Sequence, residues 1–292
     1  MIVGIVGNCQ AREVTKSLRR HFKDIEFRGY FMGAAQDAIN LENHVQDLDY
    51  CISIDIPIPY GYLATERLSK SVKNFILMPQ ITFTGLHPDI TYVKSGATNF
   101  KSPIGSYHSK IILSSFLIGL SERRTASLFN KYIYSALGYL DEFEKSKIAL
   151  LNEFERTGFN INVVELTSFA FMHTINHPSA KSISLLTKEI SARLDLNVDA
   201  WDISLDEASD GLANDTIWPV YPELAQHIGW GRDKGGLLFK PENTLARTPG
   251  ERIDLNEFIA RSFERYSTHE FNGAAVATIK PKIEREIYAL AR

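Results

Sequence analysis

The chain has 292 residues, of which 32 are Lys or Arg and 35 are Asp or Glu, so its formal net charge is -3. This near-neutral balance gives no strong electrostatic attraction to nucleic acid or to an anionic membrane. Hydrophobic residues make up 44% and charged residues 23% of the chain, which excludes the disordered, collagen-like and disulfide-rich classes. At roughly 150 residues per domain, the length corresponds to about two domains.

No segment of the sequence predicts a transmembrane helix. The longest near-apolar run, 111–120, contains serines and is far shorter than the ~20 residues that cross a bilayer. The apolar start, residues 1–6, has no basic segment before it and no small-residue cleavage pattern after it, which favours a buried strand over a signal peptide. We therefore expect a cytoplasmic protein. Cys9 and Cys51 are too few for a disulfide framework or a thiolate-rich metal site.

The N-terminal part of the chain alternates β-rich runs with helical spacings, which is typical of a parallel sheet with crossover helices. We expect strands at 2–6, 25–31, 48–55 and 74–78, with helices at 11–22, 34–43 and 60–72. Residues 79–107 then form a long polar loop. Long loops of this kind in α/β domains are often functional.

The rest of the chain is predicted to be mostly helical. Helices are expected at 108–120, 121–134, 140–157, from Pro178 onward, at 255–266 and at 281–292, and β-like segments at 161–166 and 168–172. Residues 197–250 lack clear periodicity and contain the three tryptophans. The predicted fold class is α/β, a mostly parallel sheet flanked by helices, with a helical, loop-rich C-terminal part. We expect an α/β core at 1–196, and an irregular aromatic-rich segment with C-terminal helices at 197–292 packed on it.

Cys9 lies between the first predicted strand and the first predicted helix. In an open parallel sheet this turn faces the carboxyl edge, where ligands bind, and the helix N-terminus offers free N–H groups and a partial positive charge. We expect this environment to lower the pKa of the thiol. Asn8 and Gln10 could donate side-chain hydrogen bonds to a developing oxyanion. The alternative is that Cys9 is a small buried residue, as Cys51 is expected to be within its strand.

Three polar segments contain histidines that could serve as the base or partner of a thiolate nucleophile. We favour His87 with Asp89, because an imidazole beside a carboxylate forms a usable pair of base and orienter. His177 or His173 is the second choice, and His108 lies in the remaining segment. Each of these histidines could instead be a surface residue or a satisfied core residue.

Metal and dinucleotide sites are not expected. His173 and His177 have an i, i+4 spacing, but the predicted helix begins after them, so they do not share a helical face as a zinc pair would. The glycines of residues 4–7 lack the dinucleotide-binding spacing. A basic row on the first helix could hold a phosphorylated ligand, with Arg12 best placed, although a solvated helix face explains the other members, Lys16, Arg19 and Arg20.

Four short motifs follow one another along the chain. They are Gly7-Asn8-Cys9-Gln10 directly after the first strand, His87-Pro88-Asp89, Tyr107-His108-Ser109 and Asn176-His177-Pro178. In this order the motifs resemble those of the WcbI-type polysaccharide biosynthesis enzymes of bacterial capsule clusters. The resemblance covers about residues 1–195, and the segment after that carries no matching motif.

The resemblance implies coenzyme A binding and acetyl transfer to a capsular sugar. It also implies a strand, turn and nucleophile similar to those of GDSL-type esterases, with Cys in place of Ser. Cys9 would be the nucleophile or the acyl-accepting thiol, with the base unsettled among the histidines. The implied pocket includes His87, Asp89, His108, His177, Asn8, Gln10 and Asn176, and the implied coenzyme A site includes Gly7, Arg12, Tyr107, Ser109 and His173.

The sequence leaves three functions open. The favoured one is an acyltransferase that moves an acetyl group from acetyl-CoA to a surface polysaccharide or its sugar precursor, with or without an acyl-enzyme on Cys9. The alternatives are an esterase or deacetylase acting on an acylated glycan, and a non-catalytic ligand-binding protein of a glycan pathway. Aromatic residues of 197–250 could face sugar rings or form a small satellite core. No nucleic-acid partner and no metal are expected, and a homo-oligomer is left open.

Overall fold

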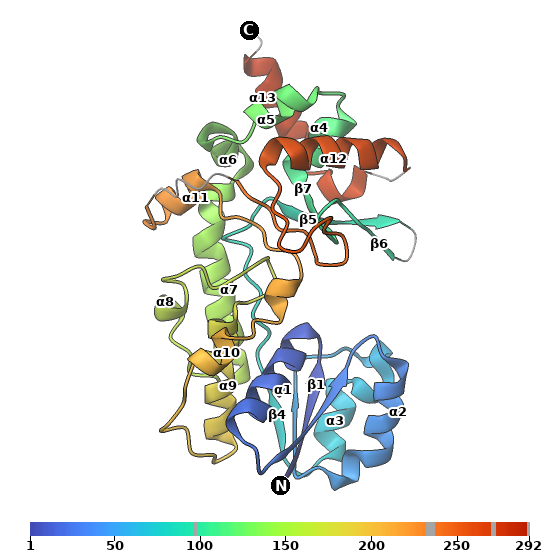
Figure 1. Ribbon diagram of the computed structural model, residues 1–292, viewed down its shortest axis with the longest axis vertical. Helices are drawn as coiled ribbons and strands as arrows, with labels where there is room; N and C mark the ends of the chain where they lie inside the picture. The colour runs from blue at the N-terminus through green and yellow to red at the C-terminus, as the bar shows by residue number, and fades with distance from the viewer. Residues whose placement is uncertain (96–97, 232–236, 270–272, 291–292) are drawn as a thin grey trace. The chain divides into compact units, whose positions relative to one another are not determined.

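The computed structural model describes residues 1–95, 98–231, 237–269 and 273–290. It divides into two compact units, each assembled from segments that are far apart in the sequence (Figure 1). Unit 1 comprises Met1–Thr82, Ile148–Met172 and His177–Leu212, and unit 2 comprises Phe83–Lys147, His173–Asn176 and Ala213–Arg292. The boundary predicted after residue 196 falls inside unit 1, because the following residues pack against the first helix of the N-terminal sheet.

Unit 1 is built on a parallel four-stranded sheet in the order β2-β1-β3-β4. The strands are β1 (Ile2–Gly7), β2 (Glu26–Phe31), β3 (Tyr50–Ser53) and β4 (Phe75–Leu77). β1 is an interior strand that pairs with both β2 and β3. Strands of a parallel sheet are covered on both faces, which explains the continuous apolar run from which this strand was predicted. The predicted α/β class and these four strands are confirmed.

The helices of unit 1 include α1, which begins at Cys9 and lies against β1 and β2 (Figure 1). α9 packs along α1. The helical elements of this unit are α1 (Cys9–His21), α2 (Ala35–His44), α3 (Thr65–Ser71), α8 (Val163–Leu166), α9 (Ala180–Arg193) and α10 (Ser204–Glu207), with 3-10 segments η1 (Val45–Asp47) and η2 (Ile58–Leu63). α7 (Glu142–Thr157) contributes residues to both units, and so does the 3-10 segment η4 (Leu212–Asn214).

Three predicted elements of unit 1 differ from the structure. The β-like segment 168–172 forms no strand, and Met172 makes only an isolated bridge to Pro178. The helix expected at 60–72 is split, because Gly61 has a φ of 65° that interrupts the 3-10 segment before α3 begins. The β-like segment 161–166 contains α8 instead of a strand. Asn162 starts that helix by accepting hydrogen bonds from the amides of Val164 and Glu165, and this local cap overrides the β propensity of the following valines.

Unit 2 contains an antiparallel three-stranded sheet in the order β6-β5-β7. The strands are β5 (Ile90–Ser95), β6 (Thr98–Phe100) and β7 (Tyr107–Ser109). The sequence predicted a loop at 79–107. The prediction was wrong over these strands, because they are short and rich in polar residues, so that no clear alternation of apolar and polar positions marks them.

The helices of unit 2 surround an aromatic core. They are α4 (Lys110–Leu117), α5 (Glu122–Ser127), α6 (Lys131–Leu137), α11 (Pro222–His227), α12 (Leu255–Ser267) and α13 (Lys280–Leu290), with 3-10 segments η3 (Tyr139–Asp141) and η5 (Gly273–Val276). Trp218 is buried and packs edge-on against Phe239 and Phe258, with ring centroids 5.1 and 5.5 Å apart. This tryptophan of the irregular segment therefore belongs to the core and is not available to face a sugar ring.

Within the described residues, each helix is too short or too polar to cross a lipid bilayer.

Candidate functional site

Cys9 opens α1 at the carboxyl end of β1, as predicted, and its side chain is partly exposed. Asn8 is the N-cap of the helix and accepts a hydrogen bond from the amide of Gln10 (2.9 Å) through Oδ1. Gly7 permits the tight passage from strand to helix, because a Cβ at this position would lie 2.8 Å from the Cβ of Ala11. The turn therefore places a cysteine at a capped helix N-terminus on the ligand-binding edge of a parallel sheet.

Gln10 holds the loop that follows β4. Its fully buried carboxamide accepts a hydrogen bond from the amide of Ile81 (3.0 Å) and donates one to the Ile81 carbonyl (2.8 Å). The sequence suggested Gln10 as a donor to an oxyanion, and the structure shows instead that its carboxamide ties the residue after Cys9 to a second loop at the same sheet edge. No local sequence signal predicts this pair, because the partner lies 71 residues away.

We expect Gln10→Leu to lower the free energy of unfolding by about 2–4 kcal/mol, because it leaves the buried N–H and C=O of Ile81 without partners. Urea titration measures this change, and hydrogen exchange at the Ile81 amide should accelerate in step. Gln36→Leu is the matched control, since Gln36 is exposed on α2. Equal losses in the two variants would contradict this role.

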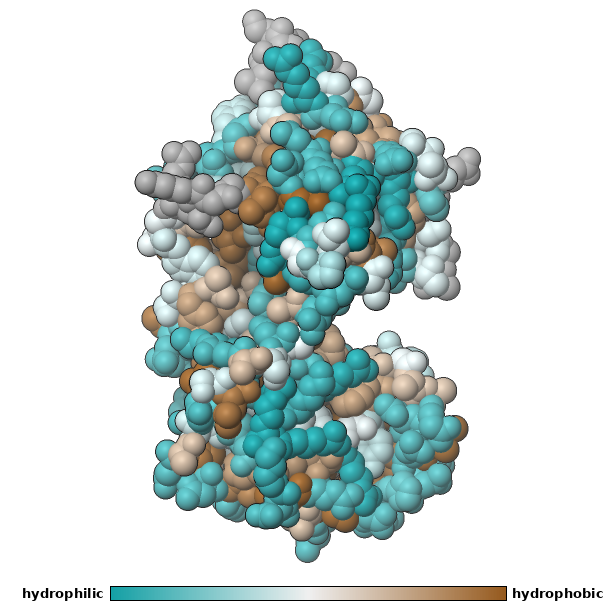
Figure 2. Space-filling model, viewed as in Figure 1, coloured by the Kyte–Doolittle hydropathy of each residue, from teal (hydrophilic) through white to brown (hydrophobic). Residues whose placement is uncertain are grey.

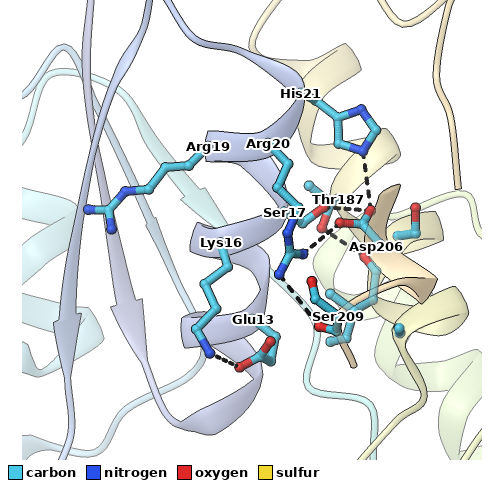
Figure 3. Close-up of polar contacts among 12 residues, drawn as sticks. Glu13, Lys16, Ser17, Arg19, Arg20, His21, Thr187, Asp206 and Ser209 are labelled. Carbon is cyan, nitrogen blue, oxygen red and sulfur yellow. Dashed lines mark hydrogen bonds and ion pairs between the residues drawn. The ribbon is translucent and has the colours of Figure 1, made fainter. Parts of the chain in front are cut away.

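The basic row on α1 is mostly committed to contacts within unit 1. Figure 3 shows Arg20 and His21 directed at Asp206, whose carboxylate is buried and also accepts a hydrogen bond from Ser17 Oγ (2.8 Å). The Asp206 carboxylate lies 2.9 Å from Arg20 Nη1 and 3.2 Å from His21 Nε2. Arg19 points away from this cluster and donates to the carbonyl of Phe27 in β2. Asp206 anchors the C-terminal half of α1, a role that the sequence did not predict.

Arg12 differs from the other basic residues of this helix. It is exposed on the first turn of α1, and its guanidinium lies over the ring of Phe31 at the end of β2, 4.9 Å from the ring centroid. Among the described residues no carboxylate forms an ion pair with it. Arg12 therefore remains the cation best placed to meet an anionic ligand at this edge of the sheet.

His177 precedes α9, which runs in the same direction as α1. Near the start of both helices, the carboxylate of Glu13 lies against Gly211, and the neighbouring Asp210 accepts a hydrogen bond from the amide of Ala180 (2.9 Å). Further along, His21 stacks on Trp201, which donates to Ser184 Oγ of α9. The N-terminal ends of α1 and α9 therefore lie at the same end of the pair. His177 and Cys9 both belong to unit 1 and occupy these ends.

The predicted pair of His87 and Asp89 is not formed. Asp89 is fully buried in unit 2, and its carboxylate accepts hydrogen bonds from Ser109 Oγ, Tyr139 Oη, Tyr221 Oη and the amide of Ile111. Burial raises the pKa of Asp89 against these opposing hydrogen bonds. The carboxylate lies at the start of α4, and its hydrogen bonds join α4 to the two tyrosines of the surrounding core. The three hydroxyls satisfy it in place of an imidazole.

His87 is also buried, and neither ring nitrogen meets hydrogen-bond geometry with a described residue. Its pKa falls to about 3, because burial disfavours the imidazolium and the nearby His173 adds to this effect, against a smaller opposing effect of the Trp218 backbone. An imidazole with so low a pKa is neutral at physiological pH but is a weak base. His87 therefore does not fit the role of general base that the sequence suggested.

The remaining predicted site residues of unit 2 form hydrogen bonds within that unit. His108 in β7 is buried between Tyr266 Oη (2.9 Å) and the carbonyl of Phe100 (2.8 Å), and burial lowers its pKa to about 4. Ser109 is the N-cap of α4. Tyr107 donates to Asn176 Oδ1 (2.7 Å) in the segment that also contains the half-buried His173. His108 and Ser109 are thus structural, a correction to their predicted places in a ligand pocket.

Cys51 lies in β3 with its side chain fully buried, as predicted, and burial raises the pKa of its thiol to about 12. Cys9 is thus the cysteine with access to solvent. Across residues 1–95, 98–231, 237–269 and 273–290, His, Cys, Asp and Glu side chains form no group of three that could hold a metal ion.

Fold and site together define an α/β protein with a partly exposed cysteine at the strand-to-helix turn of a parallel sheet. The family model described as polysaccharide biosynthesis enzyme WcbI matches residues 2–199. The chain therefore belongs to the WcbI family of polysaccharide biosynthesis enzymes, as the four motifs indicated.

A solved structure of WcbI has the same fold. Its sequence is 13% identical to that of this chain. The structural match covers 99% of this chain and 96% of the solved chain, with a TM-score of 0.72. That structure is described as the native protein without a disulfide bond between coenzyme A and a cysteine. A search of curated proteins finds no match.

Proposed function

We propose that this protein is an acyltransferase that moves an acetyl group from acetyl-CoA to a surface or capsular polysaccharide or its sugar precursor, with Cys9 as nucleophile. The observation that carries the proposal is the position of Cys9 on the first turn of α1 at the carboxyl edge of the sheet. The solved WcbI structure is described by the absence of a disulfide bond between coenzyme A and a cysteine, so the description names both groups together. In this chain Cys9 is the cysteine suited to that place, because Cys51 is buried and its thiol stays protonated at neutral pH.

The chemistry follows from the environment of the turn. The N-terminal end of α1 stabilises the thiolate, which attacks the thioester carbonyl and expels the thiol of coenzyme A after a proton is supplied. The oxyanion that forms in each step is stabilised by backbone N–H groups at the start of α1 and by the side-chain amide of Asn8. A sugar hydroxyl then loses its proton to a base and attacks the thioester on Cys9, which returns the free thiolate. This turn is similar to the nucleophile turn of GDSL-type esterases.

We assign the base to His177. It lies in the same compact unit as Cys9, and the parallel arrangement of α1 and α9 puts the start of both helices at one end. His87, the first choice from the sequence, is too weak a base when its pKa is about 3. Arg12 lies on the first turn of α1, where it is exposed and packs over the ring of Phe31. It is the residue that would meet a phosphate of coenzyme A.

Intact-mass analysis after incubation with acetyl-CoA tests the proposal. The wild type should gain the mass of one acetyl group, Cys9→Ala should gain none and should lose transfer to the sugar, and Cys51→Ala should behave as the wild type. His177→Asn should still accept the acetyl group but release it slowly to the acceptor. Absence of coenzyme A binding together with normal transfer by Cys9→Ala would refute the proposal. Release of acetate from an acetylated glycan without coenzyme A would favour a hydrolase instead.

A further inference from the structure

A hollow of about 430 Å³ lies on unit 2 between α12 and the loop that precedes this helix. Its volume falls in the range of roughly 300–1,000 Å³ that small-molecule sites occupy. Figure 2 shows strongly hydrophilic residues gathered over α12 and the preceding loop. The lining contains the arginines Arg247, Arg261 and Arg265, with Pro103 and Leu245 as its apolar part.

Two of these guanidinium groups form no close ion pair with a described carboxylate. Arg247 is exposed, and its backbone amide donates to Glu251 Oε2 (2.6 Å), but its guanidinium forms no ion pair within the described parts of the chain. Arg265 donates through Nε to the carbonyl of Lys101 (2.7 Å), which fixes its direction and leaves its Nη groups without a described acceptor. Arg265 therefore presents oriented donors to the hollow, and Arg247 presents an exposed guanidinium.

Arg261 belongs to the same lining, and carboxylates already pair with it. Its Nη2 contacts the carboxylates of Glu251 (2.8 Å) and Glu257, which balance its charge. Its Nε is buried and has no hydrogen-bond partner among the described residues. This Nε is closed off from solvent, so it does not reach a ligand in the hollow. Glu264 is the acidic residue of the lining, so the three arginines are matched in number by the carboxylates of Glu251, Glu257 and Glu264.

We propose that this hollow binds a phosphate-bearing ligand through Arg247 and Arg265. A phosphate is the anion that can accept from several guanidinium groups at once, because its oxygens point in different directions and each can take more than one hydrogen bond. The apolar Pro103 and Leu245 contact the uncharged part of the ligand. The inference deepens the proposed function and rests on it for the ligand's source, since coenzyme A and nucleotide-activated sugars both carry phosphates.

Isothermal titration with pyrophosphate at low ionic strength tests the site directly. We expect saturable binding to the wild type and at least tenfold weaker binding to the double variant Arg247→Gln/Arg265→Gln. Arg252→Gln is the matched control, because Arg252 is exposed nearby in sequence but lies outside the lining. Urea midpoints identify any loss of folding, which surface substitutions should not cause. Equal affinity in the double variant and the wild type overturns the proposal.

The source of the phosphate is identified with three further ligands. Weaker binding of coenzyme A but not of dephospho-coenzyme A in the double variant assigns the hollow to the ribose phosphate of the acyl donor. Weaker binding of UDP-glucose assigns it to an activated sugar. Unchanged affinity for all three ligands in the double variant contradicts the proposal. Acetylation of Cys9 is measured separately, so failure of the proposed function and failure of this site are distinguishable.

Discussion

Asp89→Ala is expected to lower the free energy of unfolding by at least about 3 kcal/mol, because several buried donors would lose their acceptor together. Three of these donors are the hydroxyls of Ser109, Tyr139 and Tyr221, which converge on the carboxylate from separate parts of unit 2. Urea titration monitored by tyrosine and tryptophan fluorescence measures the loss.

Asp89→Asn should be milder, because the amide keeps one oxygen and the tyrosine hydroxyls can turn to accept from its nitrogen. Asp141→Ala is the matched control, since Asp141 is exposed in the same unit. A loss below about 1 kcal/mol for Asp89→Ala would show that the hydroxyls find other partners, and would remove the carboxylate from the centre of this core.

Acid should destabilise the protein through His87 and His108. Burial lowers their pKa values to about 3 and about 4, from 6.5 in the unfolded chain. Below pH 6.5 the unfolded chain binds protons that the folded protein excludes, so the stabilisation present above pH 6.5 is lost as the pH falls. Each histidine contributes about 1.4 kcal/mol per pH unit, both act down to about pH 4, and His87 continues to about pH 3.

Asp89 acts in the opposite direction, because its raised pKa lets the folded protein keep a proton that the unfolded chain releases above pH 3.8. The comparison of variants separates these effects. His108→Asn should reduce the slope of unfolding free energy against pH by about 1.4 kcal/mol per unit between pH 6.5 and 4. An identical slope for the wild type and His108→Asn would contradict the neutral state of the buried ring.

The sheet of unit 1 was predictable because a buried parallel strand has a simple sequence pattern. β1 is a continuous apolar run, and the break at Gly7 and Asn8 marks the turn that carries Cys9. The strands of unit 2 were missed because they carry polar side chains toward solvent, as Lys94 and Ser95 do. The sequence pattern therefore identified the parallel strands of unit 1 and missed the antiparallel strands of unit 2.

The site was predictable to the level of residue type and turn. The sequence does not determine which side chains contact each other, because the contacting residues are distant along the chain. Tyr221 lies 132 residues from Asp89, and without this contact His87 looked like the natural partner of the carboxylate. The protonation of a histidine depends equally on burial, which distinguishes His87 and His108 from an exposed residue only once the fold is known.

The carboxylate that anchors α1 also sets an order of events during synthesis. Asp206 lies 189 residues after Ser17, its hydrogen-bond partner on the helix. At the usual 5–20 residues per second, the ribosome adds Asp206 roughly ten to forty seconds after Ser17. Throughout that interval the nascent helix that carries Cys9 lacks the buried acceptor for Ser17, Arg20 and His21. Unit 1 therefore completes its packing late in translation, although its sheet is encoded first.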